Sequence, residues 1–99
     1  MTTMTTVRTH TYMVEPADLE EFLARRASLI GTVREAHPGL TATVLIRLDD
    51  ETYTDTWHWA SGPQMQAALA AIGGFPEAPL AMALTKDRTT RDGLVVDQR

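Results

Sequence analysis

The sequence contains no cysteine, which excludes disulfide bonds, thiolate metal sites and a cysteine nucleophile. That composition suits a reducing compartment, so we expect a cytoplasmic protein. No apolar run approaches the length of a membrane span, and we expect no membrane contact. The segment 1–6 lacks the basic start and apolar core of a signal peptide, and is predicted to be a disordered polar tail.

Basic residues are also scarce, with 9 Lys and Arg against 13 Asp and Glu and a net charge of −4. Phosphate binding needs a basic face, so nucleic acid is excluded as a partner. The length of 99 residues predicts a single domain over 1–99. A domain of this size buries only roughly 60–65% of the surface that its unfolded chain exposes, and self-association would help it.

The first half of the chain predicts a strand, a long helix and a second strand. Residues 7–14 are rich in β-branched and aromatic side chains, and residues 40–48 are nearly all β-formers. Between them Pro16 suits a first helical turn, and apolar side chains recur at helical spacing to about residue 36. The apolar stripe consists of Leu19, Phe22, Leu23, Ala27, Ile30 and Val33. His37, Pro38 and Gly39 end this helix.

The second half begins with a strand over residues 52–59, paired with 40–48 as a hairpin. Its alternation places Tyr53, Asp55, Trp57 and Trp59 on one face. Ser61 and Pro63 start a helix whose apolar stripe includes Met65. Residues 75–84, which begin with Phe75, are predicted to form a short helix packed on the core, with an extended segment as the alternative. Residues 85–92 are predicted to be a charged loop, and 94–96 the last strand.

The resulting order, β-α-β-β-α-β, predicts an α+β fold of the ferredoxin-like type, with an antiparallel sheet and helices on one face. The strand over 40–48 carries apolar side chains on both faces, yet the helices can cover only one face. The exposed apolar face is expected to pack against a second copy of the chain, giving a homodimer.

The run HPGLTATVLIRLDDETYTDTWHWASGPQMQAAL, residues 37–69, resembles the antibiotic biosynthesis monooxygenase family. The shared features are a Pro-Gly turn after the first helix, a hairpin, and a Trp-x-Ser step into an Ala-rich helix. The resemblance implies a dimeric α+β barrel in which two sheets pack face to face. It also implies oxidation of phenolic polyketide intermediates by molecular oxygen with no metal or flavin, so we expect no cofactor. Other relatives degrade haem or act on quinols.

Several residues depart from the family pattern. Haem-degrading relatives use an Asn on the first strand and a His in the last helical stretch, whereas this chain has no Asn and carries Pro79 at the matching place. Haem degradation is therefore not expected. Quinol-type relatives often have a His where Ala68 stands and an acid where Trp57 stands. Only Trp59 matches without change.

Three residues are the candidates for catalysis. Trp59 could orient a flat substrate through its indole N–H, or could simply belong to the core. Asp55 could be a desolvated base beside the two tryptophans, or could face water at a sheet edge. His10 titrates near neutral pH and could move a proton, although a lone His on a strand is more often structural. The histidines lie on separate elements, so no metal site is expected.

Aromatic and apolar side chains are the candidates for binding the substrate, namely Tyr12, Tyr53, Trp57, Met65 and Phe75. The sequence thus predicts a small cofactor-independent monooxygenase that acts on an aromatic polyketide-type or quinol-type molecule with molecular oxygen. The alternatives are a non-oxidative cyclase or isomerase, or a non-catalytic accessory protein that binds a small molecule on the same scaffold.

Overall fold

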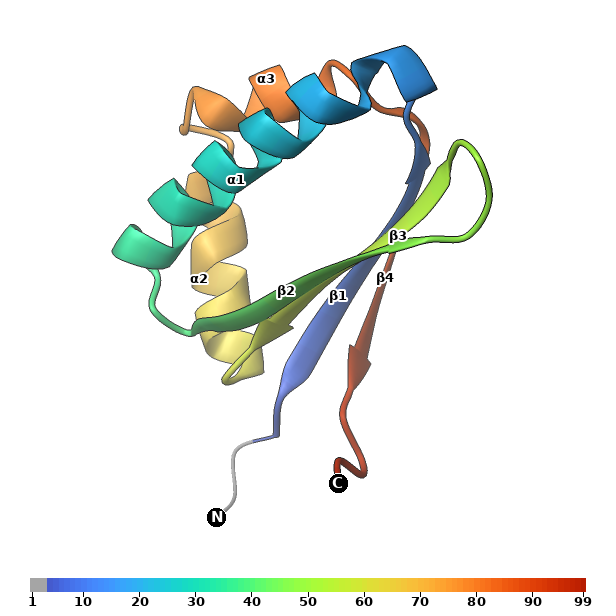
Figure 1. Ribbon diagram of the computed structural model, residues 1–99. Helices are drawn as coiled ribbons and strands as arrows, with labels where there is room; N and C mark the ends of the chain where they lie inside the picture. The colour runs from blue at the N-terminus through green and yellow to red at the C-terminus, as the bar shows by residue number, and fades with distance from the viewer. Residues whose placement is uncertain (1–3) are drawn as a thin grey trace.

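A computed structural model describes residues 4–99 of the chain, and Figure 1 shows its two layers. The four strands are β1 (Thr6–Met13), β2 (Leu40–Arg47), β3 (Thr52–Trp59) and β4 (Lys86–Leu94). The helices are the 3₁₀ turn η1 (Pro16–Asp18), α1 (Leu19–Ala36), α2 (Gly62–Ile72) and α3 (Glu77–Met82). The strands pair in the order β2-β3-β1-β4, all antiparallel, and the helices lie on one face (Figure 1). The predicted ferredoxin-like α+β fold is confirmed.

The strand β3 has neighbours on both sides, and its alternating sequence separates the two faces of the sheet. Tyr53, Asp55, Trp57 and Trp59 are all buried under the helices, while the threonines and His58 between them are half-buried on the other face. The hairpin turn before β3 is held by the Asp49 carboxylate, which accepts hydrogen bonds from the backbone N–H groups of Glu51 and Thr52 at 3.0 and 2.8 Å. This turn fixes the register that sends Asp55 inward.

The strand β2 departs from simple alternation at its start. Leu40 is paired with Trp59 and Ala42 with His58, so the register shifts by one residue between them. A bulge of this kind turns the side chains that follow it to the opposite face. Leu40 is consequently buried under the helices, whereas Val44 and Ile46 face away from them. Simple alternation along 40–48 would place Leu40 and Ala42 on one face, whereas the bulge places them on opposite faces of the sheet.

The helix α1 covers the sheet with a stripe that differs from the predicted one. Phe22, Leu29, Ile30 and Val33 are buried, whereas Leu23 is exposed. The helix ends at Ala36, and Gly39 then allows a close approach to the start of α2. A Cβ atom at Gly39 would lie only 3.0 Å from the side chain of Gln64. A side chain at this position would require the Gln64 side chain to move by a few tenths of an ångström.

The segment after α3 corrects the prediction for residues 85–96. The last strand covers Lys86–Leu94 and pairs along β1, so residues 86–92 of the predicted charged loop are strand, and of the predicted strand over 94–96 only Leu94 is strand. All nine residues of β4 are exposed, which explains why no hydrophobic pattern marks it. A register irregularity next to Asp87, which has φ of 53°, starts the strand. Aspartate tolerates that left-handed conformation better than most residues do.

The predicted disordered tail covers residues 1–6, of which residues 1–3 lie outside the described part of the chain. Thr6 was expected to belong to the tail, but it is buried in β1 opposite Trp59. The carbonyl oxygen of Thr5 also accepts a hydrogen bond from the N–H of Val95 at 2.9 Å. Among the helices of residues 4–99, none has the length and apolar character needed to cross a membrane.

The face of the sheet opposite the helices is partly apolar, as expected. The side chains of Val44 and Ile46 are nearly half exposed there, and Leu48 is exposed further along the same row. Threonines of β1 and β3 lie on the same face, together with Val7, Met13 and His58. No helix covers it in Figure 1.

Candidate functional site: a cavity between the sheet and the helices

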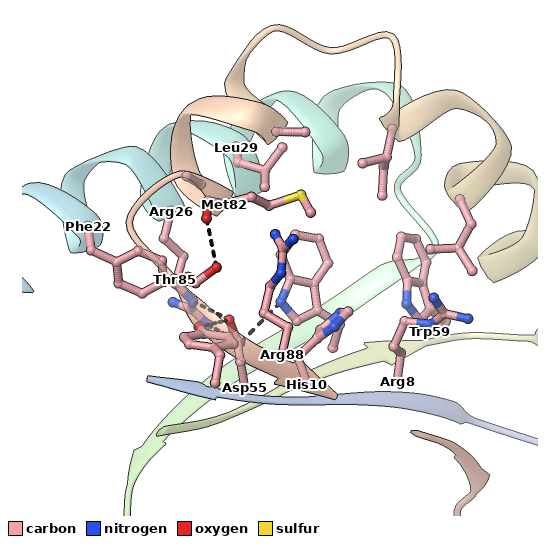
Figure 2. A pocket seen from close by; sticks show the side chains of 16 residues that line it. Arg8, His10, Phe22, Arg26, Leu29, Asp55, Trp59, Met82, Thr85 and Arg88 are labelled. Atoms are coloured by element: carbon pink, nitrogen blue, oxygen red, sulfur yellow. Dashed lines mark hydrogen bonds and ion pairs between the residues drawn. The ribbon is translucent and has the colours of Figure 1, made fainter. Parts of the chain in front are cut away.

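A cavity of about 160 Å³ lies between the sheet and the three helices. Its sheet side consists of Arg8, His10 and Tyr12 from β1 and Asp55, Trp57 and Trp59 from β3. Aliphatic and aromatic side chains of α1, α2 and α3 close the opposite side, and Arg88 of β4 lies at one edge (Figure 2). A few polar groups thus face an enclosure made mostly of apolar side chains, which is the usual character of a small-molecule site.

Asp55 is the centre of a polar network at one end of this cavity. Its two carboxylate oxygens accept hydrogen bonds from the Tyr12 hydroxyl at 2.7 Å and from the Trp57 indole at 3.1 Å. The Arg26 guanidinium adds a bidentate pair at 2.9 and 3.0 Å from α1. The residue is only 4% exposed, so the expectation of a water-facing carboxylate at a sheet edge is wrong. The carboxylate instead ties α1 to β1 and β3.

The network also fixes the protonation of its members. Burial and the adjacent Asp55 charge together raise the pKa of the Tyr12 hydroxyl, which therefore remains a hydrogen-bond donor at neutral pH. Burial alone would lower the pKa of the Arg26 guanidinium. The hydrogen bonds and charge of Asp55 outweigh that effect, and the net change is a raised pKa. Arg26 therefore stays charged, and the pair is a buried, hydrogen-bonded ion pair.

His10 lies on the same strand as Tyr12 but outside that network. Its Nδ1 is 3.2 Å from the Thr90 hydroxyl of β4, whereas Nε2 has no hydrogen-bond partner among residues 4–99. Burial lowers the pKa of the imidazole, and the carboxylate of Asp55 only partly offsets this effect. The ring is therefore neutral at neutral pH. When Nδ1 carries the proton and donates to Thr90, Nε2 is left as a free base.

The two tryptophans form an aromatic surface along one side of the cavity. Their ring centroids are 6.4 Å apart at an interplanar angle of 32°. The two indole N–H groups are used differently, since that of Trp57 donates to Asp55 while that of Trp59 has no partner within the described chain. Trp59 is only 1% exposed. A buried donor without an acceptor is costly in a folded protein, and it indicates a place where a ligand oxygen can bind.

No family model matches the sequence, and no curated protein matches it. SnoaB, a cofactor-independent oxygenase from Streptomyces nogalater, matches 98% of this chain and 95% of its own with a TM-score of 0.64 and 25% identity. A candidate antibiotic biosynthesis monooxygenase from Caulobacter crescentus matches 96% of this chain and 92% of its own, with a TM-score of 0.71 and 22% identity. The chain has the fold of the antibiotic biosynthesis monooxygenases.

The same fold also occurs in a dimeric ferredoxin-like protein from an uncultured marine organism. It matches 98% of this chain and 91% of its own with a TM-score of 0.70 and 15% identity. Other similar structures are of unknown function, such as a protein from Nitrosomonas europaea with a TM-score of 0.70 and 16% identity. The antibiotic biosynthesis monooxygenase fold therefore does not by itself determine the reaction.

Within this monooxygenase fold, five of the eight predicted site residues line the cavity. They are His10, Tyr12, Asp55, Trp57 and Trp59. The other three do not reach it. Tyr53 packs in a separate cluster at the far end of the sheet, and its hydroxyl is buried without a partner in residues 4–99. Met65 and Phe75 pack into the core between α2, α3 and the sheet.

Arg26 and Arg88 line the cavity although neither is among the predicted site residues, and the Arg88 side chain was expected to be solvated at the surface rather than to hold an anionic substrate. Arg26 follows Phe22 by four residues and precedes Leu29 and Ile30 by three and four, so it lies in the buried stripe of α1. A charged residue at such a position was a usable signal of an ion-paired site. Arg88 lies on β4, which was predicted to be a loop. Among residues 4–99, no three His, Asp or Glu side chains come together as a metal site.

Proposed function

We propose that the protein is a small cofactor-independent oxygenase that oxidises an electron-rich phenolic molecule of the aromatic polyketide or quinol type. One observation carries the proposal. A neutral imidazole and an indole N–H that has no hydrogen-bond partner among residues 4–99 lie in the same apolar cavity, the indole being one of two adjacent tryptophan rings. Such a site can hold a flat aromatic molecule, remove its proton and exclude water from the anion that results. The likeness to SnoaB supports the same class of reaction.

In this proposal His10 is the base and Trp59 orients the substrate. Nε2 of His10 removes a proton from a phenol or from an activated carbon, and the Trp59 indole N–H donates to a substrate oxygen. The carbanion form of the substrate transfers one electron to oxygen, and the two radicals combine to form a peroxide anion, which takes back the proton held by His10 and becomes a hydroperoxide. Loss of water then leaves a carbonyl group. One oxygen molecule is consumed and one water is released for each CH₂ group converted to a carbonyl group. The same stoichiometry holds when a ring CH of a phenol is converted to the second carbonyl group of a quinone.

Of the two bases that the sequence offered, Asp55 is the less suitable. Its oxygens already accept four hydrogen bonds, so a substrate proton would have to compete with Arg26 and Tyr12. Its proposed role is to position Tyr12 and Trp57 at the end of the cavity. Tyr12 and Trp57 then bind the substrate through their rings, because both polar groups are engaged by Asp55.

We also propose that the protein acts as a homodimer. The apolar row of Val44 and Ile46 lies on the sheet face that no helix covers, and one protein of similar fold is dimeric. Burial of that face would stabilise a domain of only 99 residues.

The proposal is tested by dissolved-oxygen measurements on metal-stripped protein with a panel of anthrones and naphthalenediols, read against the uncatalysed rate. Protein-dependent uptake of one oxygen per product, lost in His10→Gln, is the expected result. A product formed without oxygen uptake would instead indicate a non-oxidative cyclase or isomerase that uses the same base. Saturable binding without any product would indicate an accessory protein, and either outcome would refute the oxygenase proposal.

A further inference from the structure

The cavity is positively charged in a chain whose net charge is −4. Three guanidinium groups line it, those of Arg8, Arg26 and Arg88, against the single carboxylate of Asp55. Arg26 is neutralised by Asp55, and Arg8 is neutralised by a bidentate pair with Asp92 at 2.9 Å for both contacts. Arg88 has no acidic partner among the described residues. One full positive charge is therefore left over at the edge of an apolar enclosure.

The position of Arg88 is suited to a ligand that enters from solvent. It is an exposed residue on an edge strand, and Figure 2 shows its guanidinium over the cavity, between the sheet and Met82. Trp59 lies at another part of the same cavity (Figure 2), where it is fully buried and its indole N–H has no acceptor in the part of the chain that the structure describes. A ligand that satisfied both groups would thus have an anionic group near the open edge and a neutral oxygen acceptor inside.

Based on the proposed function, we propose that the substrate is an aromatic carboxylic acid, whose carboxylate is bound by Arg88 and whose phenolic or carbonyl oxygen meets the Trp59 indole. Guanidinium and carboxylate groups match in shape and can form two parallel hydrogen bonds. The aromatic body then lies against Trp57 and Trp59, where apolar contact is favourable. The carboxylate remains near solvent, which limits the cost of removing its water. Arg88 is a residue for substrate selection and takes no proton.

The test compares a hydroxynaphthoic acid with the carboxamide of the same acid, which has the same shape and no charge. Binding is measured by calorimetry at low and high salt. We expect the acid to bind about tenfold more tightly than the amide, as for a hydrogen bond to a charged group that is partly exposed. The preference should shrink between about 0.1 M and about 1 M salt. Arg88→Gln should remove the preference and leave the affinity for the amide unchanged.

The matched control is Arg91→Gln on the same strand. Arg91 is paired in register with Thr9, which places it on the sheet face opposite the cavity. The charge change is identical, so the acid preference should survive. Equal binding of acid and amide, no binding of the acid, or loss of the preference in both variants would overturn the inference. Oxygen uptake tests the proposed reaction separately. A preference for the acid without oxygen uptake would refute only the proposed oxygenase reaction. Oxygen uptake with neutral diols alone would refute only the proposal that the substrate carries a carboxylate.

Discussion

Replacement of Asp55 by alanine should destabilise the protein severely, because the carboxylate is the shared acceptor of a buried network. The substitution would leave the Arg26 guanidinium, the Tyr12 hydroxyl and the Trp57 indole without an acceptor. The side chains of Asp55 and Arg26 are 6% and 14% exposed, so water cannot readily replace the lost oxygens. Breaking a buried ion pair by removal of one partner costs about 3–5 kcal/mol.

That loss is large against the free energy of unfolding of a small domain, which is about 5–15 kcal/mol in total. Equilibrium unfolding in urea, followed by far-UV circular dichroism, measures it directly as a fall in the midpoint at unchanged slope. The matched control is Glu21→Ala, which removes the partner of Arg25 in an exposed pair with side chains 61% and 32% exposed. That change should cost no more than about 0.5 kcal/mol.

The double variant Arg26→Met with Asp55→Asn removes both charges and distinguishes pairing from packing. Its loss of stability should be smaller than the sum of the losses in the single variants Arg26→Met and Asp55→Asn. The difference should be at least about 1 kcal/mol, because neither charge is left unpaired in the double variant. A loss below about 1 kcal/mol for Asp55→Ala, or strict additivity in the double variant, would show that the network does not hold α1 on the sheet.

Three further changes test other parts of the structure. Trp59→Phe should lower kcat/KM about tenfold or more through loss of one donor to the substrate, while retention of full activity in steady-state assays would remove Trp59 from the site. Burial lowers the pKa of His10 below its ordinary value of 6.5, so its contribution to stability is full above pH 6.5 and is lost as the pH falls through the lower, folded-state pKa. Thermal unfolding from about pH 8 to about pH 5 should show that loss, and His10→Gln should reduce it. Ile46→Lys on the uncovered face should shift the protein to monomers in sedimentation, whereas Leu23→Lys on the exposed side of α1 should not.

Most of the fold follows from the sequence because its elements are periodic. The strand over residues 52–59 was predicted to the residue, since threonines alternate there with large aromatic and acidic side chains. The helix predicted from about residue 17 to 36 corresponds to η1 followed by α1, and α3 lies within the predicted short helix over 75–84. The strand β4 could not be predicted, because an exposed edge strand needs no apolar side chains and is held only by its hydrogen bonds to β1.

The sequence predicts only those parts of the candidate site that depend on the alternation of side chains along a strand. Alternation placed Asp55, Trp57 and Trp59 together, and likewise His10 with Tyr12. It also assigned Tyr53 to the same group, although that residue is four positions from Trp57 and lies in another cluster. Alternation determines the face of a side chain but not its distance along the strand from the helices that close the cavity. The contacts of Arg26 and Thr90 depend on tertiary structure that no local pattern encodes.

The two candidate bases illustrate why a buried acid and a half-buried histidine suit different tasks. A carboxylate buried in a cavity must be paired, because an isolated buried charge is costly. Three side chains pair with the carboxylate of Asp55, which stabilises the fold but leaves the carboxylate less able to accept a substrate proton. An imidazole can be buried in its neutral form and keep one nitrogen free, as His10 does. The same burial that forces Asp55 into an ion pair therefore keeps His10 neutral at neutral pH, as its proposed role as the base requires. The division of roles follows from the charge that each group would have to bury.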